Sequence, residues 1–215
     1  MRSFKFFMFI SVVLILFLAG CGPTQVIIRP QHPSGNYPEK FDAKIALNFD
    51  EEITTYIERL HTTGDFCAGN SYDVPVYSGI TDAVTSALQA IFSDVSIVDK
   101  IPDSTESKNY DAIITVKLGD FDDDVEITAL TYGQKAKATF QVSLNLEMFD
   151  NNMNSVFSYT PHATGIKSDR ITSCKQIGEI IGFAFEKTVA QISTDIAQSF
   201  YNSRQVADFM DGLHQ

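Results

Sequence analysis

The sequence predicts an α+β domain in which a mostly antiparallel sheet is covered on one side by two main amphipathic helices. Apolar and polar side chains alternate along residues 136–148, as in a strand with one buried and one hydrated face. Apolar residues recur at helical spacing over 78–95 and over 173–200 or beyond. Two such helices cover the apolar face of one sheet, which gives a two-layer sandwich.

The first half of the domain mixes clear and ambiguous patterns. Residues 44–49 alternate and are predicted to form a strand. Two assignments fit the segment Ile53–Leu60: the spacing of its apolar residues fits a helix, whereas its Thr, Tyr and Ile content fits a strand. Residues 62–73 are polar and indicate a loop. The helix over 78–95 is expected to be followed by a short strand over 96–100.

The second half is predicted to consist of strands and one long helix. Residues 112–118 alternate, and 125–130 continue that strand toward a turn near Gly133. After the long strand, a turn leads to a further strand over 154–160. The closing helix is expected to begin at about Ser173, and glycine at positions 178 and 182 weakens its first turns.

The N-terminus has the three parts of a secretory signal. Basic residues at positions 2 and 5 precede an apolar run over 6–18, and small residues follow. The run is shorter than the ~20 residues that cross a bilayer as a helix. The residues Leu18-Ala19-Gly20-Cys21 resemble the bacterial lipobox. That resemblance implies removal of residues 1–20 and lipidation of Cys21; the alternative is an ordinary signal peptide.

Several acyl chains on Cys21 would hold the protein firmly, since each buried methylene contributes ~0.8 kcal/mol. In similar enterobacterial lipoproteins an Asp after the cysteine is associated with the inner membrane, whereas here Gly22 follows. The resemblance therefore implies the outer membrane, facing the periplasm. Residues 21–40 hold four of the seven prolines and are expected to form a tether of up to ~60 Å, followed by a single domain over 41–215.

The chain is acidic. Its formal charge is −11, and removal of residues 1–20 with their two cations gives −11 − 2 = −13. This charge argues against nucleic acid as a partner and against docking on anionic lipid by a polybasic patch. The two cysteines that remain, Cys67 and Cys174, are expected to form a disulfide in an oxidising compartment. Two unpaired buried thiols are the alternative.

The densest acidic cluster gives only a weak metal-site candidate. Asp120, Asp122 and Asp124 are its possible ligands, but the spacing of a calcium-binding EF-hand loop is missing. Alternate strand residues also point to opposite faces. We therefore interpret the run as an acidic edge that discourages strand pairing, and expect no metal and no cofactor.

The sequence contains no recognisable catalytic motif. Its four histidines are scattered, and it lacks the nucleophile elbow, the zinc-protease helix motif and the glycine-rich nucleotide loops. We therefore expect no enzyme. Aromatic residues near the C-terminus are interface candidates, with packing on the protein's own sheet as the alternative. These candidates are Phe200, Tyr201, Phe209 and Met210.

The layout as a whole resembles small outer-membrane lipoproteins of the YajG type. The likeness lies in the lipobox, the proline-bearing segment, the helix ending in residues 87–92, the strand at 110–114, the alternating hairpin and the closing helix. It implies a lipoprotein of the cell envelope and carries no catalytic residues. Our leading hypothesis is a non-enzymatic domain that binds an envelope partner. The alternatives are a binder of a small or amphipathic ligand between sheet and helices and, less favoured, an unrecognised hydrolase.

Overall fold

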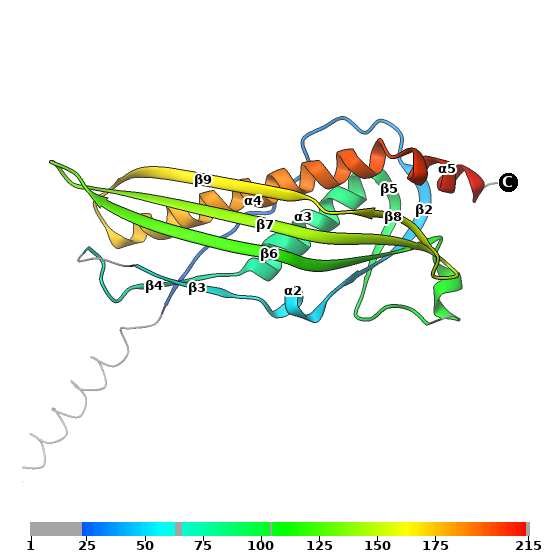
Figure 1. Cartoon of the computed structure of the whole chain (residues 1–215), viewed down its shortest axis with the longest axis horizontal. Helices are drawn as coiled ribbons and strands as arrows, with labels where there is room; N and C mark the ends of the chain where they lie inside the picture. The colour runs from blue at the N-terminus through cyan, green and yellow to red at the C-terminus, as the bar shows by residue number, and fades with distance from the viewer. Residues whose placement is uncertain (1–22, 63–65, 104, 214–215) are drawn as a thin grey trace, which may run out of the picture.

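The computed structural model describes residues 23–62, 66–103 and 105–213, and Cys21 lies outside them. It confirms the predicted α+β class: a long, twisted sheet packs against two long helices (Figure 1). The hairpin of β6 and β7 runs along most of the molecule, with α4 beside it. Within the described ranges, no helix is both long enough and apolar enough to cross a bilayer.

The main sheet has six strands among the described residues, in the order β5-β2-β6-β7-β8, and β9 also pairs with β7. The pairs of β7 with β6, β8 and β9 are antiparallel, whereas β2 is parallel to β5 and β6. The strands are β2 (Phe41–Phe49), β5 (Phe92–Val98), β6 (Ala112–Ala129), β7 (Gln134–Asp150), β8 (Ser155–Tyr159) and β9 (His162–Ile171).

A smaller sheet of three described strands has the order β1-β4-β3. It consists of β1 (Thr24–Gln25), β3 (Glu58–His61) and β4 (Ser71–Val74). The described helices are α2 (Glu51–Thr55), α3 (Val76–Ile91), the 3₁₀ helix η1 (Glu106–Asn109), α4 (Cys174–Tyr201) and α5 (Arg204–Gly212). A capping box of Ser173 and Gln176 begins α4, which satisfies two of the unpaired backbone amides of its first turn.

A β-bulge in β6 decides which of its side chains face the helices. Leu118 pairs with Leu144 and Phe121 with Val142, so β6 holds one residue more than β7 at this point. The Ser143 hydroxyl accepts a hydrogen bond from the Asp120 amide at 2.6 Å. A bulge shifts the alternation by one residue. Even-numbered residues therefore face the core before the bulge, and odd-numbered residues face the helices after it.

The structure differs from the predicted boundaries in several places. The helix predicted over 78–95 ends at Ile91, because Phe92 is already extended and begins β5 beside β2. The segment Ile53–Leu60 contains the end of a helix and the start of a strand, since α2 ends at Thr55 and β3 begins at Glu58. The predicted loop over 62–73 contains the start of β4. The closing helix breaks after Tyr201, and α5 follows.

The strand β9 was not predicted. It is an edge strand with six polar residues and a glycine among ten, so its alternation is weak. Gly165 lies at its contact with α4, where a Cβ atom would collide with the Ala184 carbonyl oxygen and the Thr188 hydroxyl. Gly165 weakens the alternating pattern of β9 in the sequence, and because it has no side chain it also allows the strand to approach α4 closely.

The four C-terminal interface candidates pack within or against the protein's own core. Phe200 and Met210 are buried, which contradicts their assignment to an exposed interface. Tyr201 and Phe209 are partly buried and pack against the same core. The Phe200 ring contacts Phe92 and Phe157, at centroid distances of 6.4 and 4.9 Å. The alternative interpretation, a helix end packed on its own sheet, is the observed one.

The close contact of β9 with α4 predicts that Gly165→Ala destabilises the domain. A methyl group at this position meets helix backbone that cannot move aside, and overpacking of this kind costs about 1–3 kcal/mol. Denaturant unfolding measures the change. Gly212→Ala is the control, because the space around Gly212 in α5 is open. Equal stability of the two variants would contradict this account of the contact.

Candidate functional site

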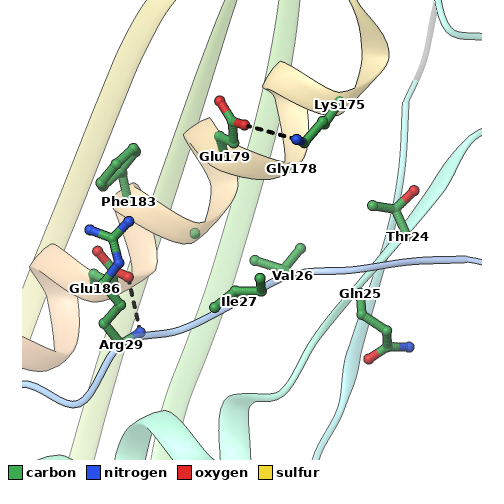
Figure 2. Close-up of a pocket in the computed structure, with 11 residues that line it drawn as sticks. Thr24, Gln25, Val26, Ile27, Arg29, Lys175, Gly178, Glu179, Phe183 and Glu186 are labelled. Atoms are coloured by element: carbon green, nitrogen blue, oxygen red, sulfur yellow. Dashed lines mark hydrogen bonds and ion pairs between the residues drawn. The ribbon is translucent and has the colours of Figure 1, made fainter.

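A groove runs along the N-terminal half of α4, between this helix and the first described residues of the chain (Figure 2). We call it the α4 groove; its volume is about 420 Å³. Its lining comes from two places far apart in the sequence, residues 24–29 and residues 175–186. The lining residues are Thr24, Gln25, Val26, Ile27, Arg29, Lys175, Gly178, Glu179, Gly182, Phe183 and Glu186.

The N-terminal segment is bound to the domain and does not extend away from it. Val26 is buried, and its amide donates to the Asp73 carbonyl at 2.9 Å. The Arg29 amide donates to Glu186 Oε1, and the Ser34 amide to Thr194 Oγ1, each at 2.9 Å. The described part of the predicted tether, 23–40, thus differs from a free spacer, because three of its backbone amides donate hydrogen bonds to residues of β4 and α4.

Glycine in α4 makes this approach possible. A Cβ atom at Gly182 would lie 3.0 Å from the Ile27 carbonyl oxygen, and one at Gly178 would lie 3.4 Å from the Tyr72 ring. These are the two glycines that weaken the helix in isolation. Since they remove side chains from the face that receives the segment, they serve the tertiary contact at the expense of local helix propensity.

The surface of the groove combines exposed apolar side chains with cations. Ile27 is 81% exposed and Phe183 is 41% exposed. The Arg29 guanidinium lies 5.5 Å from the centre of the Phe183 ring, and Lys167 Nζ lies 5.9 Å from it. Both distances are within the range of cation–π attraction. The groove is therefore amphipathic, with Arg29 from its lining and Lys167 from just outside it close to one aromatic ring.

An ion pair fixes the strand beside the groove. Asp73 in β4 is largely buried, and Arg59 of β3 binds its carboxylate with two hydrogen bonds of 2.7 and 3.0 Å. Gln25 of β1 donates a third, at 3.3 Å. The hydrogen bonds from Arg59 hold the pKa of Asp73 below its ordinary value. One carboxylate thus links all three strands of the small sheet.

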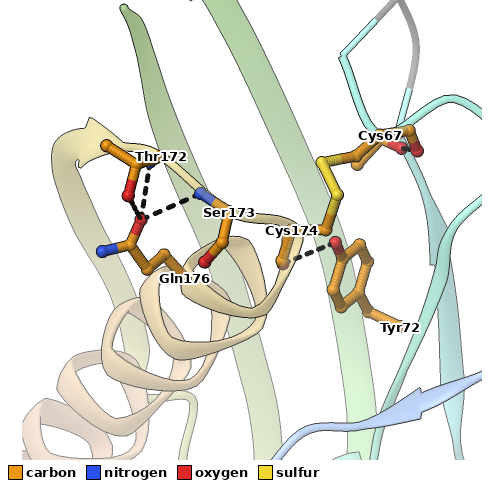
Figure 3. Close-up of a disulfide and its surroundings, with 7 residues drawn as sticks. Cys67, Tyr72, Thr172, Ser173, Cys174 and Gln176 are labelled. Atoms are coloured by element: carbon orange, nitrogen blue, oxygen red, sulfur yellow. Dashed lines mark hydrogen bonds between the residues drawn. A yellow bond between two sulfur atoms is a disulfide. The ribbon is translucent and has the colours of Figure 1, made fainter.

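A disulfide lies at the start of α4, between Cys67 and Cys174 (Figure 3). The two Cα atoms are 5.7 Å apart. The Tyr72 hydroxyl donates to the Cys174 carbonyl at 2.8 Å, beside the bridge. Cys67 has a positive φ of 62°, which is unfavourable for a residue with a side chain. The bridge joins this loop, and β4 after it, to the helix that forms the groove.

A separate cluster of titratable groups lies where β3 approaches β6. Asp123 follows the bulge, so it faces the helices from a position opposite Phe140. Burial, followed by the nearby Glu58 carboxylate, raises its pKa to about 6. Tyr56 donates to Glu58 at 2.6 Å and packs edge-on against Phe121. The members of the cluster are partly buried, and none of them lines the α4 groove.

The candidate metal ligands do not assemble into a site. Asp120, Asp122 and Asp124 are exposed on β6, while Asp123 between them faces the opposite side. Across the described ranges, no three potential ligand side chains gather closely enough to hold a metal ion. The bulge separates the cluster into an outward row of carboxylates and one inward carboxylate.

Sequence reasoning missed the α4 groove. Local pattern places Ile27 in a short apolar run and Phe183 in a helix, whereas the exposure of both side chains depends on the fold. The only sequence signal for the groove is the pair Gly178 and Gly182, four residues apart on one helix face, which is a pattern that permits close approach of another backbone.

Removal of the disulfide is predicted to destabilise the domain. Its cysteines are 107 residues apart, and loss of such a bridge costs roughly 2–5 kcal/mol. The variant Cys67→Ser/Cys174→Ser should therefore unfold at lower denaturant than the oxidised protein. Reduced wild-type protein is the matched control and should unfold with the double variant. Insensitivity of the wild type to reductant would contradict the bridge.

The raised pKa of Asp123 predicts a stability change with a defined sign. The carboxyl is easier to protonate in the folded than in the unfolded chain, so its penalty appears as pH rises from about 4 to about 6. Asp123→Asn should stabilise the protein by roughly 1–2 kcal/mol at pH 7.5, after allowance for solvent screening, and have little effect at pH 3.5. Unfolding at both pH values, with the outward-facing Asp122→Asn as control, measures this; equal effects of the two variants would contradict it.

Comparison with known proteins identifies structures of similar fold but no family for this chain. No family model and no curated protein matches this chain. A crystal structure of XCC0632 from Xanthomonas campestris, of family DUF330, matches with a TM-score of 0.51 at 12% identity, over 90% of this chain and 97% of that one. A minor lipoprotein from Acinetobacter baumannii matches with a TM-score of 0.41 at 10% identity, over 75% and 95%. This chain therefore shares the fold of XCC0632.

Proposed function

We propose that the protein is a lipoprotein of the cell envelope, anchored through acyl chains on Cys21, whose domain binds an envelope partner and catalyses no reaction. The anchor rests on the sequence Leu18-Ala19-Gly20-Cys21 after a basic and apolar leader. The favoured location is the outer membrane, facing the periplasm. The disulfide supports an oxidising compartment, because such bridges are rare in the cytosol.

One observation carries the binding role: the space between sheet and helices is filled. Apolar side chains of both layers meet there with no exposed surface, as with Leu47 and Ile114 of the sheet and Ile181 and Phe185 of α4. The domain therefore offers outer surfaces to its ligands. The tip of the β6–β7 hairpin is one such surface, since Tyr132 there is 87% exposed.

A binder of small or amphipathic ligands is the second candidate. The predicted place for such a ligand, between sheet and helices, is occupied by the core. The α4 groove favours this function at a different place, because several hundred Å³ with a largely apolar surface and a few charged groups suits a small amphipathic ligand. A hydrolase has the least support. The carboxyl with a raised pKa, Asp123, lies opposite Phe140 and is surrounded by other carboxylates, with no nucleophile among the groups that shift its pKa.

The lipid anchor predicts that the protein incorporates labelled palmitate at one residue. Wild-type cells grown with the label should yield a labelled protein, and Cys21→Ala should yield none, because the acceptor sulfur is absent. The variant Cys67→Ser/Cys174→Ser keeps Cys21 and should remain labelled, which controls for acylation of other thiols. Full labelling of Cys21→Ala would overturn the proposed anchor.

A further inference from the structure

We propose that the α4 groove lies against the phospholipids of the bilayer that holds the acyl chains of Cys21. Ile27 and Phe183 would enter the acyl region, and the cations around them would meet lipid phosphates. This inference rests on the proposed lipidation and goes beyond it, since a lipid anchor alone leaves the orientation of the domain open.

The short distance between the anchor and the first paired residue carries the argument. Thr24 pairs with Tyr72 of β4, and it lies only three positions after Cys21. Three extended residues span at most ~10 Å. The following residues are bound to β4 through the Val26 amide and to α4 through the Arg29 amide, so they provide no additional length. A bilayer attached at Cys21 must therefore lie close to the surface around Thr24, which lines the groove.

The chemistry of this surface suits the interface of a bilayer. Aromatic rings and long cationic side chains are favoured there, because the apolar part enters the lipid while the charge stays with the headgroups. Phe183 has cations of this kind around it, since Arg29 and Lys167 lie over its ring. Lys187 is close by, and its Nζ donates to the Ile166 carbonyl at 3.3 Å. Ile27 adds a mostly exposed aliphatic side chain.

The acidic residues of the groove do not give it a strong negative charge. Glu186 accepts the hydrogen bond from the Arg29 amide, and Glu179 lies 4.0 Å from Lys175. Lys167 also has a carboxylate neighbour, Asp169, at 3.6 Å. The local charges thus nearly balance in a chain that is strongly acidic as a whole. A nearly neutral, amphipathic surface approaches a negatively charged bilayer more easily than the rest of the protein.

The absence of tryptophan from the sequence allows a direct test. We would prepare the full mature lipidated chain with Phe183→Trp and reconstitute it in vesicles of phosphatidylethanolamine and phosphatidylglycerol, with or without brominated acyl chains. Bromine quenches tryptophan only on close approach, so we expect a loss of fluorescence and a blue shift at position 183. Ile27→Trp should behave alike, and its exposed position leaves the fold undisturbed.

Ile97→Trp is the matched control, because Ile97 is 58% exposed and belongs to β5, which lies near the C-terminal end of α4, away from the groove (Figure 1). It should show no quenching in the same vesicles. The charge reversal Arg29→Glu/Lys187→Glu, combined with Ile27→Trp, should reduce the quenching at position 27. Equal quenching at positions 183 and 97 would show a domain without fixed orientation, and would overturn the proposal.

The outcomes separate this inference from the proposed anchor. If the chain floats with the vesicles but the tryptophan is quenched neither in Phe183→Trp nor in Ile27→Trp, the anchor stands and the groove proposal is wrong, which leaves the groove to a protein or a small ligand. If mass spectrometry finds no acyl chain on Cys21, both proposals fall, because the short distance to the bilayer then has no basis.

Discussion

The burial of α4 against β7 and β9 is the contact on which the rest of the structure depends. A helix of 28 residues spans about 42 Å, which matches the length of a long β-hairpin. Its buried face, from Ile177 to Phe200, closes the core. Its other surfaces receive α3, the N-terminal segment and the disulfide, so one helix organises both sheets.

Glycines at two contacts with α4 allow other segments to pack closely against this helix. Gly165 brings β9 close to the helix backbone, and Gly182 brings Val26 and Ile27 close from another side. Each absent side chain removes a steric barrier between two backbones. The arrangement has a functional consequence, because a segment that starts three residues after the proposed anchor is thereby held to the domain. The domain then has a defined face toward whatever surface the anchor occupies.

Much of the fold was predictable because strong periodicity reflects burial. The alternation over 136–148 indicated β7, and the helical spacing before Ile91 and after Ser173 indicated α3 and α4. β9 was not predictable, since an edge strand with a glycine and polar residues lacks alternation. The parallel pairs of β2 were missed for another reason: strand direction depends on the connections between strands, which local patterns do not record.

By itself the sequence determined the α+β class, the acidic charge and the positions of the cysteines, and it predicts a signal peptide over residues 1–20, because these follow from composition and local pattern. Only the tertiary structure decided what those parts do together. A single bulge turned Asp123 inward, helix packing took Phe200 and Met210 into the core, and contact with α4 bound a proline-rich segment that composition alone describes as a free tether. These outcomes depend on contacts between residues far apart in the chain, which no local window contains.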